Sequence, residues 1–299
     1  VYDVCHTCRR CVSLCESFPT LFDLIDESET FELDSVDKND FQKVVDECYM
    51  CDLCYQTKCP YVPPHPWALD FPHLMLRGKA IAYQEKNKSL KQRARDSALT
   101  STDSLGKLMK LPLVDITYEA ISKSPKARKI AAKITGVHEE APWPNFEKSV
   151  KTYIPKSIEN VTATDKTTGK VALFTGCYCR NNDAELANDL LKVFEHNNIE
   201  TRVILDDKCC GMPKLDLGDL KSVENLMKHN VPKLLQEIDE GFDIISLVPS
   251  CVLMFKQELP LLFDENDDLK KIKQHIFDPF EYLSDRESKG LMNKSFKNS

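Results

Sequence analysis

Residues 5–15 read CHTCRRCVSLC, and residues 48–60 read CYMCDLCYQTKCP. In both stretches three cysteines follow one another with two residues between them, and a fourth comes shortly afterwards. The last gap has three residues in the first stretch and four in the second. Thiols grouped this tightly are typical of metal ligands, because one short loop can direct several sulfurs at the same site.

This spacing predicts two 4Fe–4S clusters. Such a cluster needs one thiolate for each iron, and in two-cluster ferredoxins each motif gives its fourth thiolate to the other cluster. The expected ligands are Cys5, Cys8, Cys11 and Cys59 for the first cluster, and Cys48, Cys51, Cys54 and Cys15 for the second. A structural zinc pair would instead use two CxxC pairs for each metal. The gap of four residues before Cys59 departs from the bacterial motif, which has three, although Pro60 follows as it does there.

The bulk composition limits the class of protein. The chain has 299 residues, 42% of them hydrophobic, with a net charge of −7, which disfavours non-specific nucleic-acid binding. Its thirteen cysteines are an odd number, which argues against a secreted disulfide framework. We find neither a signal peptide nor an apolar run of the roughly 20 residues that span a membrane. We therefore expect a cytoplasmic protein, and the opening Val1 suggests a fragment or a processed form.

Charge is distributed unevenly along the chain. Residues 1–65 carry 5 basic and 13 acidic side chains, whereas residues 71–135 carry 14 basic and 5 acidic ones. The basic stretch is either a solvated helical face or a docking face for an acidic partner or a lipid surface. Peripheral association with the inner face of the membrane therefore remains open.

Three domains are expected, and together they predict an α+β multidomain fold. Residues 1–66 form a helical, ferredoxin-like two-cluster domain, in which bound metal is expected to replace a hydrophobic core. Residues 67–165 have no cysteine and show helical periodicity broken by Pro112 and Pro125, which predicts a connector without chemistry. In residues 166–299 apolar runs alternate with helical patterns, which predicts an α/β domain with a short parallel sheet.

Four further cysteines follow the three strands expected at 171–174, 201–205 and 244–248. They are Cys177, Cys209, Cys210 and Cys251. Open α/β sheets place their sites at the carboxyl ends of strands, so these sulfurs are candidate ligands of an iron–sulfur or zinc centre. Gly211 permits a bend that presents two adjacent sulfurs. Cys179 would share a face with Cys177 if the strand continued, and could be a fifth ligand, a redox-active thiol or a buried residue.

The order of these motifs resembles a known superfamily. The phrases that carry the resemblance are DVCHTCRRCVSLCESFPTLFDL, CYMCDLCYQTKCPYVPPH, CCGMPKL and PSCVLMFKQELP. They resemble the B subunit of heterodisulfide reductase, the C subunit of anaerobic glycerol-3-phosphate dehydrogenase and the glycolate oxidase iron–sulfur subunit. Within this group of CCG-domain Fe–S oxidoreductases, they look most like a bacterial branch linked with rubrerythrins.

The resemblance implies a metal centre held by the CCG cysteines. In heterodisulfide reductase five cysteines of such a module hold a noncubane cluster that reduces a disulfide. Here the position of the fifth cysteine is Met254, and the second CCG module of the family is missing. We expect either a fragment that lacks that module or a member that works with half of the site.

The function expected from these patterns is electron transfer. Two 4Fe–4S clusters would pass electrons to or from the CCG centre, in an iron–sulfur subunit of an oxidoreductase with no catalytic residue of its own. One alternative is a disulfide or peroxide-linked reductase acting at Cys209, Cys210 and Cys251, and another is a ferredoxin fused to a structural zinc module. The chain has no glycine-rich dinucleotide fingerprint, so the expected redox partner is a separate protein such as a flavin dehydrogenase subunit or rubrerythrin.

Overall fold

The computed structural model describes residues 1–85, 89–146, 158 and 161–295. The chain divides into two compact units. The first consists of Val1–Arg93 and Pro213–Leu220, and the second of Ala94–Met212 and Lys221–Ser299. The segment expected as a connector is therefore shared between the units. Helix α4 (Phe71–Gln84) belongs to the first unit, α5 (Leu90–Thr100) crosses the boundary, and α6 (Thr102–Met109), α7 (Pro112–Lys123) and α8 (Pro125–Thr135) belong to the second.

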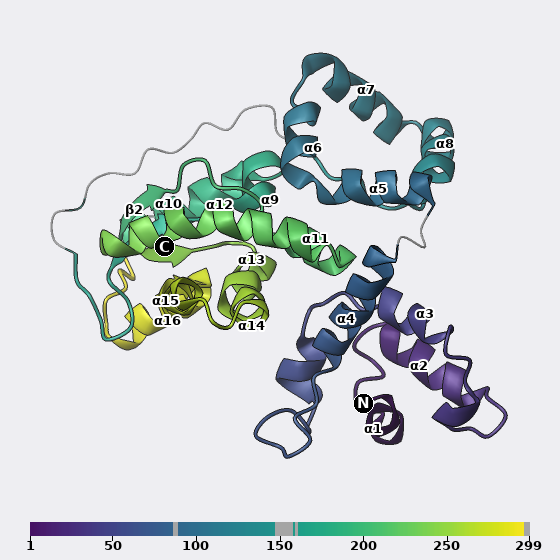
Figure 1. Ribbon diagram of the computed structural model, residues 1–299. Coiled ribbons are helices and arrows are strands. Elements are labelled where there is room, and N and C mark those ends of the chain that lie inside the picture. Colours follow the sequence, from purple (N-terminus) through teal and green to yellow (C-terminus); the bar gives the residue numbers. More distant parts are fainter. Residues whose placement is uncertain (86–88, 147–157, 159–160, 296–299) are drawn as a thin grey trace. The chain divides into compact units, whose positions relative to one another are not determined.

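The first unit is helical, as expected (Figure 1). Its helices are α1 (Tyr2–Cys8), α2 (Ser17–Asp26), α3 (Phe41–Asp46) and α4, with short turns η1 (Leu33–Ser35) and η2 (Cys54–Lys58). Helix α3 packs against both α2 and α4.

A hydrophobic core stabilises this unit, so the expectation that metal replaces a core is wrong. Helix α2 buries apolar residues at positions i, i+3, i+4 and i+7, which lie on one helical face. They are Phe18, Leu21, Phe22 and Ile25. They share the core with Val44 and Val45 of α3 and with Phe71, Met75 and Leu76 of α4. The expectation failed because α4, which completes this core, lies beyond residue 66, where the expected domain ends.

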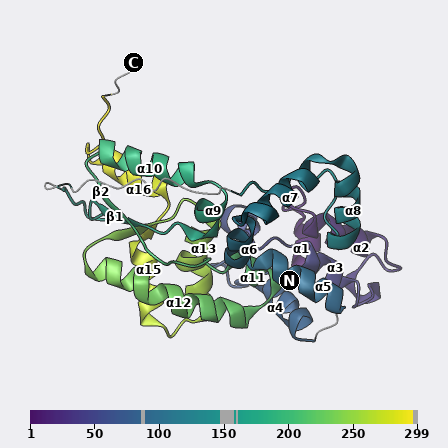
Figure 2. The same cartoon turned by 90° about the horizontal axis from the view of Figure 1, so that it is seen from above.

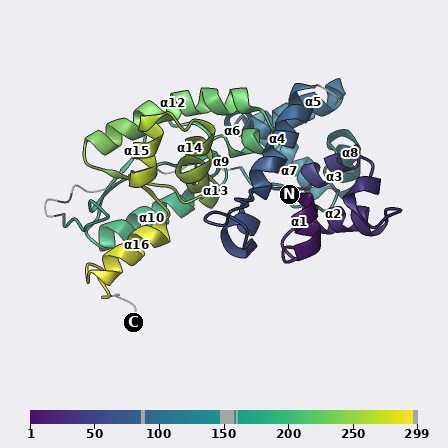
Figure 3. The ribbon, with the colours of Figure 1, turned by 60° about the horizontal axis from the view of Figure 1, so that its bottom comes forward.

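The second unit is built on a parallel sheet of four strands in the order β2-β1-β3-β4. The strands are β1 (Lys170–Leu173), β2 (Glu200–Val203), β3 (Asp243–Ile245) and β4 (Ile276–Phe277). The three predicted strands are confirmed, and β4 is additional. Helices α10 (Ala184–His196) and α16 (Pro279–Ser288) cover one face of the sheet, and α12 (Leu220–Asp239) and α15 (Asp267–His275) cover the other (Figures 2 and 3). The remaining elements of this part are α9 (Gly176–Asn181), α11 (Met212–Leu217), α13 (Pro249–Leu253), η3 (Met254–Glu258) and α14 (Leu259–Leu262).

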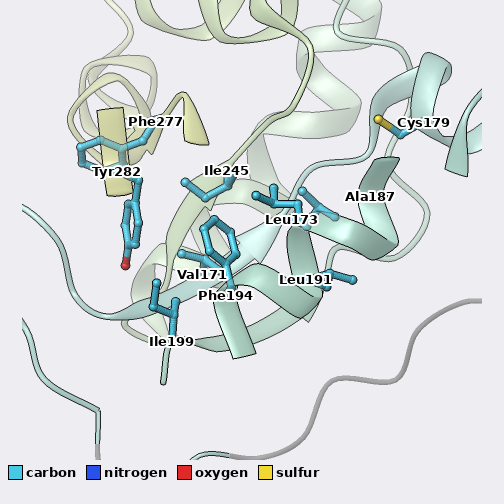
Figure 4. Close-up of a cluster of buried hydrophobic side chains, with 11 residues drawn as sticks. Val171, Leu173, Cys179, Ala187, Leu191, Phe194, Ile199, Ile245, Phe277 and Tyr282 are labelled. Carbon is cyan, nitrogen blue, oxygen red and sulfur yellow. The ribbon is translucent and has the colours of Figure 1, made fainter. Parts of the chain in front are cut away.

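Apolar side chains between the sheet and α10 form the core of the second unit (Figure 4). Val171 and Leu173 of β1 meet Phe194 of α10 and Tyr282 of α16 there, and burying each such side chain contributes about 1.5–3 kcal/mol. Cys179 lies in the same cluster. It follows Cys177 on helix α9, not on a strand, and residues two apart on a helix do not face each other. The premise for Cys179 as a fifth ligand is therefore wrong.

Candidate metal centres

The cysteines expected to hold the first cluster are brought together in the first unit. We call Cys5, Cys8, Cys11 and Cys59 the first thiol set. All four line one cavity, whose wall also includes Phe18 and Leu69. Cys5 and Cys8 lie on α1, whereas Cys59 follows η2, so the cavity joins parts of the chain that are far apart in sequence.

Left-handed backbone residues shape both cysteine loops. Arg9, between Cys8 and Cys11, has φ 50°, and its N–H donates to the Cys5 carbonyl at 2.9 Å. Met50 and Asp52 have φ 52° and 58° in the other loop. Alternating right- and left-handed residues point successive N–H groups to one side, which suits an anionic iron–sulfur cluster.

A π-helical turn accommodates the one residue by which the gap between Cys54 and Cys59 exceeds that of the bacterial motif. Residues Cys54–Lys58 form η2, and the N–H of Cys59 donates to the carbonyl of Cys54, five residues earlier, at 2.9 Å. A π-turn accommodates one more residue than an α-turn. The departure from the bacterial spacing therefore does not remove Cys59 from the first set.

Electrostatic coupling among these thiols reflects their proximity. Burial, then the nearby Cys11 and Cys59, raise the pKa of Cys5 to about 12. Burial, then Cys59 and Cys8, raise the pKa of Cys11 to about 11. Four thiolates so close together would repel one another, and bound iron cations would remove that repulsion.

The second thiol set consists of Cys48, Cys51, Cys54 and Cys15. Burial raises the pKa of Cys48 to about 11, against the opposing effects of the Met50 N–H and Lys79, and the nearby Cys15 and Cys51 add to the rise. Burial also raises the pKa of Cys15, whose sulfur accepts hydrogen bonds from the first N–H groups of α2. Cys15 is thus a neighbour of Cys48 and Cys51, and Cys59 lines the cavity of the first set. Which thiols share a cluster, and the binding of iron itself, stay predictions.

The two sets adjoin each other. Burial raises the pKa of Cys54, and the next largest contribution comes from Cys11 of the first set. Cys11 is also influenced by Cys15 of the second set. Clusters held by these sets would consequently be neighbours, which electron transfer between them requires.

The CCG cysteines gather at the carboxyl edge of the sheet in the second unit. Cys177 follows β1 on α9, Cys209 and Cys210 follow β2, and Cys251 follows β3 on α13. The strand order reverses between β1 and β3, and ligands of open α/β sheets bind at such a switch point. Gly176 has φ 61°, and a Cβ placed there would be 3.4 Å from the Cys251 sulfur. The loop after β1 thus approaches the loop after β3 closely.

These four thiols neighbour one another in the order Cys177, Cys209, Cys210 and Cys251, and each acts on the pKa of the next. The hydrogen bond to Cys209, followed by burial, raises the pKa of Cys177 well above its ordinary value. The pKa of Cys209 rises to about 12, because the bond to Cys210 and burial outweigh the lowering effect of Cys177. Within the described residues, no three His, Cys, Asp or Glu side chains converge as ligands of a single metal ion would.

A polar network holds the CCG loops in place. Asp103 of α6 accepts the Cys209 N–H at 2.8 Å and pairs with Arg180 at 3.1 Å. Arg180 also pairs with the buried Asp207, which accepts the Gly176 N–H at 2.8 Å. This network connects the backbones on which Cys177 and Cys209 lie.

Helix α6 therefore contributes to the site, and the expectation of a connector without chemistry is wrong for this helix. Thr102, next to Asp103, places its buried hydroxyl beside Cys177 and Cys209. Neither residue stands in a cysteine motif, so no local pattern marks them. Only the packing of α6 against α9 brings them to the thiols.

Met254 occupies the position of the missing fifth cysteine and reaches the CCG loop. Its side chain is fully buried, and its methyl carbon lies 3.4 Å from where a Cβ on Gly211 would be. A thioether cannot become a thiolate, so the described site offers Cys177, Cys209, Cys210 and Cys251 as its sulfur ligands.

Comparison with known proteins agrees with this geometry. Residues 171–256 match the family model of the CCG cysteine-rich domain. The C subunit of anaerobic glycerol-3-phosphate dehydrogenase from Escherichia coli K12 is 24% identical over 184 residues, which cover 61% of this chain and 45% of that protein. Residues 171–256 are thus a CCG cysteine-rich domain, and the matches support the resemblance to the CCG iron–sulfur oxidoreductase superfamily that the sequence shows.

Two further relatives match shorter stretches of this chain. The B subunit of fumarate reductase (CoM/CoB) from Methanothermobacter marburgensis is 28% identical over 118 residues, 39% of this chain and 22% of that protein. Citrate utilization protein B of Escherichia coli is 29% identical over 84 residues, 28% of this chain and 20% of that protein. The chain thus spans less than half of the length of the curated relatives described here. No solved structure gives a significant match.

Proposed function

We propose that this chain is an electron-transfer iron–sulfur subunit in which two 4Fe–4S clusters exchange electrons with a third centre at the CCG cysteines. The observation that carries the proposal is the grouping of eight thiols into two adjacent sets, with Cys15 and Cys59 exchanged between the motifs. Two relatives are named as subunits of a dehydrogenase and a reductase, which supports a redox role.

The chain's own residues would bind and shield the clusters. The first thiol set would hold one cluster and the second set the other, and each cluster when bound takes up and releases single electrons. Phe18 and Phe71 stack with ring centroids 4.5 Å apart in the core beside the cysteines, which keeps water from this side of the sets. Backbone N–H groups of the two cysteine loops would orient toward the sulfurs and stabilise negative charge.

The third centre would be held by Cys177, Cys209, Cys210 and Cys251. A zinc ion needs its ligands gathered about 2.3 Å from one point. The CCG thiols instead follow one another in a chain, which favours a centre with more than one iron over structural zinc.

A disulfide or peroxide-linked reductase is the second candidate, favoured by the direct contact of Cys209 with Cys210 and of Cys210 with Cys251. Thiol chemistry of this kind requires an accessible thiolate. All three thiols are buried. Cys177 lowers the pKa of Cys209 and Cys209 lowers that of Cys210, but the effects of Cys210 and Cys251 respectively, together with burial, outweigh this and raise both pKa values, which opposes thiolate formation. We therefore favour an electron-transfer role for the CCG centre.

The redox partner would be a separate protein, such as a flavin dehydrogenase subunit or rubrerythrin, and the chain would bind no dinucleotide itself. An anaerobic titration of the full chain with dithionite tests the proposal. We expect the visible absorbance of the clusters to bleach in one-electron steps, and to return when an oxidised flavoprotein is added. Absorbance that does not respond to reductant would contradict electron transfer.

We further propose a cytoplasmic location with peripheral attachment to an anionic membrane surface. Among the described residues no helix has the length and apolar character of a membrane span. Helix α8 exposes Ile130 and Ile134 together with Lys126, Lys129 and Lys133, a combination typical of interfacial helices. Flotation with vesicles that contain phosphatidylglycerol should capture the chain and fail when the three lysines are replaced by glutamine. Equal flotation of both proteins would contradict this attachment.

A further inference from the structure

Residues 204–211, which include Cys209 and Cys210, form a loop between β2 and α11 and belong to no helix or strand. The two cysteines are only 3% and 2% exposed. Backbone N–H and C=O groups that are buried outside regular structure need other partners, since an unpaired one costs about as much free energy as a lost hydrogen bond. At Cys209 these partners are side chains of two helices.

Asn230 of α12 binds the loop with both ends of its carboxamide group. Its Oδ1 accepts the Lys208 N–H at 2.9 Å, and its Nδ2 donates to the Cys209 carbonyl at 3.1 Å and to the Lys208 carbonyl at 3.3 Å. Asn230 is 1% exposed. A carboxamide offers a donor and an acceptor side by side, so it pairs with the loop as the backbone of a neighbouring strand would.

Asp103 of α6 holds the other side of the same residue. Its Oδ2 accepts the Cys209 N–H at 2.8 Å, across a separation of 106 residues in the sequence. The N–H and the C=O of Cys209 are thus each bound by a side chain, one from α6 and one from α12. Because both groups are fixed, the backbone of Cys209 is restricted, and so is the place that its thiol can occupy.

The loop after β1 is held by the same part of the chain. Asp207, two residues before Cys209, has a buried side chain that accepts the Gly176 N–H at 2.8 Å. Gly176 directly precedes Cys177. Arg180 pairs with Asp207, and a buried carboxylate without such a cation would be costly. The backbones of Cys177 and Cys209 are therefore connected through side chains that are not themselves metal ligands.

We propose that Asp103 and Asn230 are positioning residues of the third centre, which hold Cys209 in a metal-ready geometry before metal binds. The inference rests on the proposed function, because the positioned thiols serve that centre. Ordering a flexible loop at the moment of binding costs conformational free energy, and a loop that is already fixed reduces this cost. Groups that orient metal ligands in this way typically raise metal affinity by about 10- to 100-fold.

The test compares Asn230→Ala and Asp103→Ala with the wild type, all as full chains purified without oxygen. Mössbauer spectroscopy of iron-57-labelled protein follows the loss of iron from the third centre to a chelator. We expect this loss to be about tenfold faster or more in both variants, because Cys209 is no longer held. The clusters of the first unit should lose iron at the wild-type rate.

A second measurement does not depend on bound metal. Once a chelator has removed the iron from the full chain, iodoacetamide should alkylate Cys209 and Cys210 about tenfold faster in both variants than in the wild type. The reason is that a loop with an unpaired buried backbone group opens more readily. Cys179, which lies in the hydrophobic core, should keep its rate of alkylation.

Two matched variants make the result specific. Asn197→Ala removes another buried asparagine of the same domain, whose side chain bonds Val193 and Asn293 at 2.8 Å, and it should leave both rates unchanged. Asp103→Asn keeps an oxygen that can accept the Cys209 N–H, and it should restore most of the protection that Asp103→Ala loses.

Equal rates in Asn230→Ala and Asn197→Ala, or in Asp103→Ala and Asp103→Asn, overturn the inference. If Asn230→Ala fails to fold, the comparison of the two Asp103 variants decides it alone. A wild-type chain that binds no iron at the CCG cysteines would instead overturn the proposed third centre. That result is seen before any variant is compared, and the alkylation rates then still decide whether Asp103 and Asn230 position Cys209.

Discussion

Replacing Cys59 with serine is expected to abolish the cluster that Cys5, Cys8 and Cys11 hold, and to leave intact the cluster bound by its own sequence neighbours. The physical reason is the grouping of the thiols, since Cys59 lines the cavity of the first set together with these three residues. The π-turn between Cys54 and Cys59 carries Cys59 away from its neighbours to that cavity. About half of the iron bound by the first unit should be lost, because one of two clusters is removed.

EPR of the reduced protein, together with iron analysis, measures this effect. Cys15→Ser is the matched control, because Cys15 lies with the second set and its loss should remove the other signal. Loss of the second-set signal in Cys59→Ser, with the first-set signal retained, would show that each motif binds its cluster alone.

The second large effect is expected at the CCG site. Cys210→Ser should remove the third centre and leave the two clusters of the first unit unchanged. Cys210 is buried in the middle of the thiol chain, in contact with both Cys209 and Cys251. A serine hydroxyl there cannot supply a thiolate, and it breaks the connection between the other sulfurs. Metal analysis and Mössbauer spectroscopy of iron-57-labelled protein measure the loss.

Cys179→Ala is the matched control for this experiment, because Cys179 also belongs to the cysteine-rich domain but lies in the hydrophobic core. It should retain the third centre at a modest cost in stability. A third centre that survives in Cys210→Ser would show that the CCG cysteines do not hold metal. A centre lost in Cys179→Ala, from protein that is still folded, would make Cys179 a ligand after all.

The sheet could largely be predicted from the sequence. Two of the strands begin as short apolar runs, at Val171–Phe174 and Ile244–Val248, and each run is followed by a helical pattern. Apolar residues recur with different periods in strands and in helices, so the two kinds of element can be told apart. The strand at Ile276–Phe277 could not be predicted, because two apolar residues carry no periodicity. The extension of β1 to Cys179 was wrong because Gly176, with its positive φ, begins a helix there.

Within the candidate sites, only the residues that stand in the cysteine motifs could be predicted from the sequence. The cysteine spacing, together with the ligand exchange of two-cluster ferredoxins, predicts which thiols share a cluster, and this assignment of Cys15 and Cys59 stays a prediction. Asp103 could not be predicted, because it lies far in sequence from Cys209, whose N–H it accepts. Its position depends on the packing of α6 against α9. The hydrophobic core of the first unit was missed for the same reason.

The central claim is that the thiols of this chain hold iron–sulfur clusters. The most direct test is the iron, sulfide and zinc content of the chain purified without oxygen, combined with EPR after reduction. We predict about eight irons with matching sulfide in two interacting clusters, together with additional iron at the CCG cysteines. Zinc in place of iron, or a protein without a reducible EPR signal after reconstitution with iron and sulfide, would contradict the account.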